Sequence, residues 1–201
     1  MEERGYLLLD NGQKEYFPEG IQVLSGYENR QDIVEVYIPN SVFLIDNQAF
    51  HLCRNLQKVS CNAEKSSLIH IGWAAFYLCA SLQNFQAPKS LRVVGAYAFL
   101  GAAFLAIDFS NAAQLAFLGG HAFQACSQLI VVKLPNCAPG HAITISECCF
   151  YECENLLSIT GGPISNVGLN AFPSNDQLLR IPTINEYATI GEENDSLKAL
   201  M

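Results

Sequence analysis

The sequence predicts a mainly β protein built as a solenoid, in which a short unit is repeated and the copies stack on one another. The first observation is a series of phenylalanines spaced 22–27 residues apart, namely Phe50, Phe76, Phe99, Phe123, Phe150 and Phe172. The second is that positions around each phenylalanine keep their residue type from copy to copy. The third is a run of alternating apolar residues in each copy, typical of a strand with one buried face. Because so small a unit cannot bury its apolar side chains alone, we expect about six to seven stacked copies, joined by short turns and 3-10 segments.

The composition indicates one globular domain and argues against partners with dense negative charge. Of the 201 residues, 50% are hydrophobic and 15% are charged, which excludes a disordered chain. The net charge of -8 would repel nucleic-acid phosphates and anionic membrane surfaces. The apolar runs are far shorter than the roughly 20 residues that span a bilayer, and the first residues lack a signal-peptide pattern. We therefore expect no nucleic acid and no membrane as partners, and a location that is cytoplasmic or reached by a Sec-independent route into a host cell.

Residues 1–32 are expected to form an N-terminal cap. Two short apolar or aromatic runs between Tyr6 and Phe17 flank Asn11-Gly12, the strongest hairpin signal in the chain. A cap is needed because the exposed end of a stack of strands would offer its edge to other chains. The repeated region, residues 33–182, then begins at Ile33 with a first copy that lacks a phenylalanine.

Four positions around each phenylalanine form columns. The residue before it is alanine in five of the six copies, and the residue five before it is always aliphatic. The residue four before it belongs to types that tolerate a positive φ or a tight turn, which predicts a chain corner: Asp46, Gly72, Gly95, Gly119, Ser146 and Gly168. The third residue after it is a cysteine in four copies: Cys53, Cys79, Cys126 and Cys153. A buried free cysteine packs as a small hydrophobe, so this column predicts a ladder of buried thiols.

Each copy contains two extended sides. In the first, inward residues alternate with outward ones, as at Phe85 and Ala87, and a proline such as Pro88 follows where no further ladder hydrogen bond is required. In the second, an apolar pair such as Leu91 and Val94 predicts another short strand. One coil of the solenoid is therefore a strand, a corner, a second extended side and the turn that carries the phenylalanine.

With these columns in register, segments such as IPNSVFLIDNQAFHLCRNLQKV and PKSLRVVGAYAFLGAAFLAI resemble the BspA-type leucine-rich repeat family over about residues 33–182. The resemblance implies a right-handed leucine-rich-repeat solenoid whose strands after each leucine line one sheet. It also implies protein binding, since members of the family occur in bacterial surface proteins and in secreted effectors. The third copy is one residue short after Ala102, and copies two and five carry extra residues at 62–67 and 136–142. We expect these departures to change loop shape but not the fold.

Residues 183–201 begin as half a repeat, in which the letters TIG at 189–191 match HIG at 70–72, and then lose the pattern. The acidic end from Glu192 resembles C-terminal signals of bacterial type IV secretion effectors, which makes an effector role in virulence one hypothesis. The tail contains no repeat column, so we expect it to be dispensable for folding.

Two classes of function stay open from the sequence, and the first is a cysteine-dependent enzyme. Cys148 and Cys149 follow His141, and a thiol with a nearby base is the pattern of a nucleophile. However, Cys149 occupies the alanine column before Phe150, where packing already explains it. Zinc spacing, phosphate loops, and dinucleotide and hydrolase motifs are absent from the sequence, so no metal and no cofactor are expected. All eight cysteines are expected to be reduced.

The second and preferred hypothesis is a non-enzymatic protein-interaction module. Outward side chains of the strands after each leucine define the predicted sheet face: Glu35, Tyr37, Lys58, Ser60, Asn84, Gln86, Asp108, Lys133, Ser158, Thr160 and Arg180. Their charges are mixed in sign, which suits a protein surface better than a phosphate site, and Tyr37 is the kind of side chain that anchors interfaces. We expect a monomer that binds a protein partner. The opposite face and the inserted loops are the alternative sites, and solvated side chains without a partner are the alternative to any site.

Overall fold

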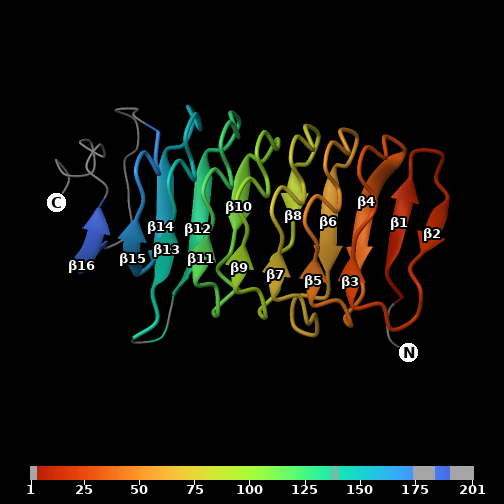
Figure 1. Cartoon of the computed structure of the whole chain (residues 1–201), viewed down its shortest axis with the longest axis horizontal. Coiled ribbons are helices and arrows are strands. Elements are labelled where there is room, and N and C mark those ends of the chain that lie inside the picture. The colour runs from red at the N-terminus through yellow and green to blue at the C-terminus, as the bar shows by residue number, and fades with distance from the viewer. Residues whose placement is uncertain (1–3, 137, 139, 174–183, 191–201) are drawn as a thin grey trace.

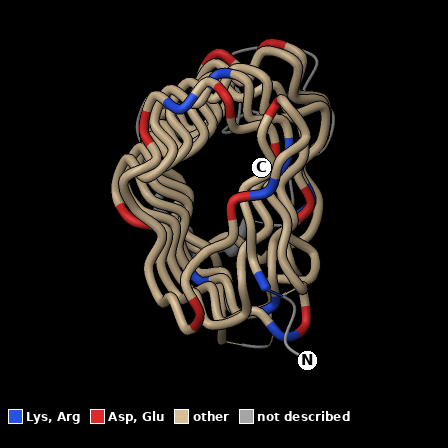
Figure 2. The backbone as a smooth tube through the Cα atoms, turned by 90° about the vertical axis from the view of Figure 1, so that its right-hand side faces the viewer, with Lys and Arg blue, Asp and Glu red and all other residues tan. Residues whose placement is uncertain are grey.

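In the computed structural model the chain winds into one elongated stack of short strands, with β1 and β2 at one end and β16 at the other (Figure 1). The structure describes residues 4–136, 138, 140–173 and 184–190. Within these residues every regular element is a strand, and from β2 to β15 successive strands alternate along the chain between two layers. Viewed along the stack, successive coils lie behind one another, with the layers on opposite sides of a common core (Figure 2). The predicted solenoid is confirmed.

The first layer contains the strands that follow each leucine, and it is divided into two sheets. A five-stranded sheet has the order β2 (Lys14–Tyr16), β1 (Tyr6–Leu9), β4 (Ile33–Ile38), β6 (Lys58–Cys61) and β8 (Asn84–Phe85). A three-stranded sheet has the order β10 (Ala106–Asp108), β12 (Val131–Asn136) and β14 (Ser158–Gly162). The expectation of one continuous sheet is therefore wrong, because the ladder stops between β8 and β10.

The second layer is one uninterrupted sheet. Its eight strands are β3 (Val23–Leu24), β5 (Leu44–Ile45), β7 (His70–Ile71), β9 (Val93–Val94), β11 (Phe117–Leu118), β13 (Ile143–Ile145), β15 (Ile164–Val167) and β16 (Ile184–Ile190). Neighbouring strands are parallel throughout, because equivalent segments of successive coils run in the same direction. The second apolar pair of each copy thus forms the second extended side that the sequence predicts.

A ladder of stacked aromatic rings occupies the core between the layers. Its centroids are 5.1–5.9 Å apart, and its members are Tyr27, Phe50, Phe76, Phe99, Phe123, Phe150 and Phe172. The six predicted phenylalanines are buried. Tyr27 lies inside the segment assigned to the cap, where Leu24 also pairs with Ile45 as one coil pairs with the next. Repeat packing therefore begins before residue 33, with a tyrosine in place of the phenylalanine.

Tight turns form the predicted corners, but the glycines serve another purpose there. The Ala75 N–H donates to the Gly72 carbonyl at 3.4 Å, which closes a turn four residues long. Neither Gly72 nor Gly95 has a positive φ. Instead, a Cβ on Gly95 would lie 2.7 Å from the backbone of Gly72 in the preceding coil. Glycine is thus required by the close approach of two backbones.

Positive φ angles occur two residues before and two residues after the ring position. At Gln48 and Leu52, which flank Phe50, φ is 57° and 59°. Between them the Phe50 N–H points to the next coil and donates to the Ala75 carbonyl at 2.8 Å. Because residues with positive φ lie on both sides of the ring residue, a helical run cannot form there. In the described residues the bends are therefore turns and not the 3-10 segments that we expected.

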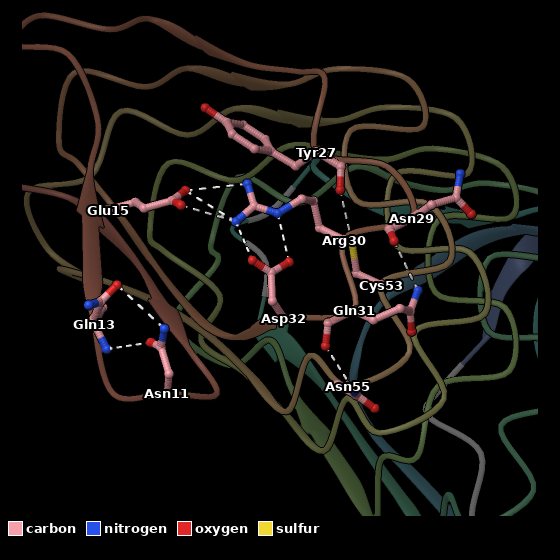
Figure 3. A network of polar contacts seen from close by, with 10 residues as sticks. All are labelled: Asn11, Gln13, Glu15, Tyr27, Asn29, Arg30, Gln31, Asp32, Cys53 and Asn55. Carbon is pink, nitrogen blue, oxygen red and sulfur yellow. Dashed lines mark hydrogen bonds and ion pairs between the residues drawn. The ribbon is translucent and has the colours of Figure 1, made fainter.

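The N-terminal hairpin lies at one end of the stack. β1 and β2 are antiparallel, and β1 pairs in turn with β4, so the hairpin covers the edge of the first complete coil. Arg30 joins the hairpin to the coil, since its guanidinium bonds both carboxylate oxygens of Asp32 at 2.6 and 2.7 Å and Glu15 at 3.2 Å (Figure 3). Hydrogen bonding from Arg30 lowers the pKa of Asp32.

At the other end, β16 pairs with β15 in parallel, with Thr189 opposite Asn166 and Ile190 opposite Val167. Thr189 and Ile190 thus hold the positions in β16 that Asn166 and Val167 hold in β15. Arg180 of the predicted sheet face and the tail from Glu192 lie outside the described residues, so the dispensability of the tail stays a prediction.

Candidate functional site

Charged residues of the predicted sheet face pair with each other across neighbouring strands. Lys58 lies opposite Glu35 in register, and the Lys58 Nζ is 2.9 Å from a Glu35 carboxylate oxygen. Lys133 lies opposite Asp108, with a distance of 3.1 Å between Nζ and Oδ2. Burial acts to raise the pKa of Asp108, but hydrogen bonds from Ser110 and Lys133 outweigh it and lower that pKa. The face is therefore locally neutral at both pairs.

The missing residue of the third copy explains the break in this layer. In intact copies equivalent N–H groups continue a ladder, as where the Gln83 N–H donates to the Gln57 carbonyl at 3.0 Å. If the third copy followed the same pattern, the Leu105 N–H would donate to the Gln83 carbonyl. Instead the Ala103 N–H donates to the Leu82 carbonyl at 2.9 Å. The two copies are therefore joined out of register, and β10 does not pair with β8.

A polar pocket of about 650 Å³ lies at this break. Five residues of the predicted sheet face line it, namely Lys58, Ser60, Asn84, Gln86 and Asp108. Further polar groups come from Gln83 and from the turn at Ser110 and Asn111, and the inserted loop contributes Ala63. The structure thus brings the middle of the predicted face together around a hollow, which the sequence pattern of outward residues does not show.

Four described residues of the predicted sheet face are less exposed than a free outward position: Glu35, Tyr37 and Ser158 are half-buried, and Ser60 is buried. Ser60 is buried, with 8% of its surface exposed, so it lies deep in the lining of the polar pocket. Tyr37 is half-buried, because its ring stacks on that of Tyr6 in the cap at a centroid distance of 5.6 Å. Its role as an interface anchor was inferred from strand alternation alone, which does not show that the hairpin covers this position. At the far end of the face, Thr160 is exposed and Ser158 is half-buried.

An apolar row beside the three-stranded sheet was missed by sequence reasoning. Leu105, 59% exposed, lies with Ile130 and Leu157 in successive coils, and these side chains line a hollow of about 300 Å³. The signal is present in the sequence, since the equivalent positions in earlier copies are Gln57 and Gln83. A comparison of this outward position between copies would have shown that amide side chains in the earlier copies give way to apolar side chains in the later ones.

The predicted ladder of buried thiols is confirmed, and each thiol has a hydrogen-bond acceptor. Each Sγ donates to the carbonyl of the ring residue in the preceding coil, at 3.0–3.3 Å: Cys53 to Tyr27, Cys79 to Phe50, Cys126 to Phe99 and Cys153 to Phe123 (Figure 3 shows the first). Burial raises the pKa of Cys53 and of Cys61 to about 11. All seven described cysteines are free thiols, and Cys137 lies outside the described residues.

The surroundings of the candidate nucleophiles disfavour thiolate chemistry. Cys149 is buried, and burial raises its pKa well above the ordinary value. Cys148 is half-buried, and burial together with two neighbouring glutamates also raises its pKa. The His141 Nε2 lies 3.1 Å from the Leu115 carbonyl, where it donates a hydrogen bond instead of serving a thiol. Since the thiolate is the nucleophilic form, these contacts favour structural cysteines.

Other kinds of site find little support in the described part of the chain. Its His, Cys, Asp and Glu side chains form no group of three that could hold a metal ion. Nor does it contain a helix with the length and apolarity needed to cross a membrane. One buried side-chain nitrogen, the Nδ1 of His51, has no hydrogen-bond partner there, and the His51 ring stacks on Tyr77 at 4.9 Å.

The coils, the ring ladder and the strand-lined face together define a leucine-rich-repeat solenoid. The family model described as "BspA type Leucine rich repeat region" matches residues 25–138 and 59–179, with six copies. The chain belongs to the BspA-type leucine-rich repeat family, and the resemblance seen in the sequence is confirmed. The match begins at residue 25, which agrees with the ring of Tyr27 at the start of the ladder. Repeats of this family typically serve as non-enzymatic scaffolds for protein interaction. No curated protein matches the chain.

The chain is similar to solved structures from several bacteria. A leucine-rich repeat protein from Bacteroides ovatus has a TM-score of 0.67 and 21% identity, over 95% of this chain and 55% of that protein. The T. pallidum leucine-rich repeat protein has a TM-score of 0.43 and 22% identity, over 78% of this chain and 86% of that one. The pneumococcal vaccine antigen PcpA has a TM-score of 0.46 and 17% identity, over 92% of this chain and 43% of that protein. The chain thus spans about half of the Bacteroides protein, and that likeness shows the fold alone.

Proposed function

We propose that the protein is a non-enzymatic scaffold that binds a protein partner through the predicted sheet face. The observation that carries the proposal is the make-up of that face. Its charges neutralise one another at Lys58 with Glu35 and at Lys133 with Asp108, while amide groups such as Asn84 are exposed between them. A mixed polar surface beside an exposed apolar row resembles the rim and core of protein interfaces.

Capture of partners tests this proposal with a matched pair of variants. In the face variant, Lys58, Asp108, Lys133 and Thr160 are all changed to Ala. In the control variant, His70 and Arg92, exposed residues of the second layer, are changed to Ala. We expect tagged wild-type protein and the control to capture the same partner from host or bacterial lysates, and the face variant to lose it at an unchanged melting temperature. Capture that survives the face variant would move the site to the second layer or the inserted loops.

A finer hypothesis is that the protein acts as a monomeric effector exported into a host cell. Its support is the acidic segment from Glu192, which resembles signals of type IV secretion effectors. A reporter fused to the chain with and without this segment would measure translocation in a bacterium that has such a secretion system. Equal translocation of both forms would remove the reason for the hypothesis, and a lowered melting temperature of the shortened form would assign the segment to folding.

A further inference from the structure

The break between β8 and β10 leaves two strand edges that border one space. Each strand is paired on its other side, β8 with β6 and β10 with β12, whereas no register joins β8 to β10 among the residues that the structure describes. Backbone groups on an unpaired edge are a template for another strand. The polar pocket lies at these edges, since both strands contribute to its lining.

The lining of the polar pocket suits a partner group that is polar but uncharged. Its lysine and its aspartate are committed, Lys58 to Glu35 and Asp108 to Lys133. The remaining polar lining is rich in primary amides, of which Asn84 on β8 is exposed. A primary amide offers two N–H donors and a carbonyl acceptor, the same groups that a peptide main chain presents and requires.

We infer that an extended peptide segment of a protein partner fills the polar pocket by adding to the edges of β8 and β10. This inference rests on the proposed function, because the pocket lies within the predicted sheet face. In strand addition the main-chain hydrogen bonds supply affinity, and alternate side chains of the peptide contact the lining, here the apolar surface of Phe85 and Ala106. The volume of about 650 Å³ falls in the range of roughly 300–1,000 Å³ for ligand pockets.

Other ligand classes match the pocket less well. An anion needs an available cation, but the Lys58 ammonium is 2.9 Å from the Glu35 carboxylate. A metal ion needs a cluster of ligating side chains, and the described residues contain none. A soluble oligosaccharide would use the amides, but it has no main chain to pair with two strand edges.

A displayed library of short random peptides, selected on the full chain, supplies the probe. Affinities of selected peptides are then measured by calorimetry for wild type and variants. In the amide variant, Gln83 and Asn84 are both changed to Ala, which removes two exposed amides without touching the core. We expect about a tenfold loss of affinity, because the hydrogen bonds from these amides to the peptide are lost. The control, His70→Ala with Arg92→Ala, changes exposed residues that do not line the pocket and should bind as wild type.

A second variant closes the pocket without removing its lining. One asparagine inserted after Ala103 restores the length of the third copy, and we expect it to join β8 to β10 and abolish peptide binding. If this variant does not fold, the amide variant still decides. Failure to select any peptide, or peptides that bind the amide variant as tightly as wild type, would overturn the inference. Lysate capture that is lost with the face variant but kept by the amide variant would overturn this inference alone and leave the proposed function standing.

Discussion

At the scale of single residues, each inner ring of the core ladder is held by the rings of the coils on either side. Phe123, for example, stacks on Phe99 at 5.4 Å and on Phe150 at 5.3 Å. The two central rings are fully buried, whereas Lys58 projects from the predicted sheet face and makes one exposed ion pair. The stability of the protein is therefore concentrated in the columns that the sequence identifies.

Replacing Phe99 or Phe123 by Ala is expected to lower the free energy of unfolding by about 3–5 kcal/mol, because each change leaves a cavity in the ring ladder. Lys58→Ala should lower it by only about 0–1 kcal/mol, since an exposed ion pair contributes little. Urea unfolding followed by circular dichroism measures all three. Losses of similar size at the three sites would contradict the assignment of core and face.

The thiol ladder predicts a loss of stability at alkaline pH. Burial raises the pKa of Cys53 to about 11 in the folded protein, from 9.0 for an ordinary thiol. Above the lower value the unfolded chain releases the proton while the folded chain keeps it, so stability falls as pH rises from about 9 to about 11. The slope is about 1.4 kcal/mol per pH unit for each such thiol, and below pH 9 the contribution is complete.

Urea unfolding at a series of pH values, with a reducing agent present, measures this slope. Cys53→Ala serves as the control, because it removes one titrating thiol and leaves the other ionisable groups of the chain unchanged. We expect a shallower alkaline slope for the variant than for wild type. Parallel slopes for the two proteins would show that Cys53 is not protected from ionisation by the fold.

At the scale of elements, one absent residue separates two sheets. Intact copies place a polar residue before the leucine, which is asparagine in two of them. One of these, Asn155, donates from its side-chain amide to the Ser127 carbonyl of the coil before it at 2.7 Å. The third copy has only Ala103 between its column alanine and Phe104. The chain therefore reaches its leucine position one residue early, and the strand that follows starts out of register.

Inserting an asparagine after Ala103 is expected to extend the ladder across the break. Amide N–H groups of β10 should then exchange with deuterium more slowly, because they gain carbonyl partners on β8. Hydrogen exchange read by mass spectrometry or NMR measures the change. The same insertion after Glu64, in the inserted loop, should leave β10 unaffected. Unaltered exchange of β10 in the first variant would show that the break has a cause other than length.

At the scale of the whole molecule, the protein is a one-dimensional stack in which each coil contacts its neighbours. Stability in such an assembly is shared between adjacent copies and is weakly coupled over longer distances. The hairpin of β1 and β2 covers one end of the first layer, with Arg30 tying Glu15 to Asp32. This end is closed to further coils, because the edge strand β2 is short and charged and so disfavours pairing with another strand.

Double-mutant cycles test this nearest-neighbour organisation. Phe99→Leu and Phe123→Leu affect rings in contact, so their combined loss of unfolding free energy should differ from the sum by about 0.5–1.5 kcal/mol. Phe50→Leu and Phe123→Leu affect rings separated by two others, and these losses should add to within about 0.3–0.5 kcal/mol. Equal coupling in both cycles would indicate a core that responds as one unit.

Much of this architecture could be predicted from residue order because burial follows periodicity. The spacing of Phe99 and Phe123 predicts the repeat and the burial of both side chains, and the alternation around Phe85 predicts which side chains face inward. The Asn11-Gly12 turn predicts the hairpin, and the cysteine column predicts buried thiols. Each of these is a local pattern, repeated or flanked by clear signals, so no knowledge of distant contacts is needed.

The sequence by itself determined the repeat, its inward and outward faces and the family to which the chain belongs. Only the tertiary structure decided the division of the first layer, the polar pocket at that break, the cover over Tyr37 and the entry of Tyr27 into the ladder. The reason is that periodicity specifies the direction of a side chain along one strand. The register between strands depends instead on which backbone groups of adjacent coils meet, and a single missing residue before Phe104 changes that choice.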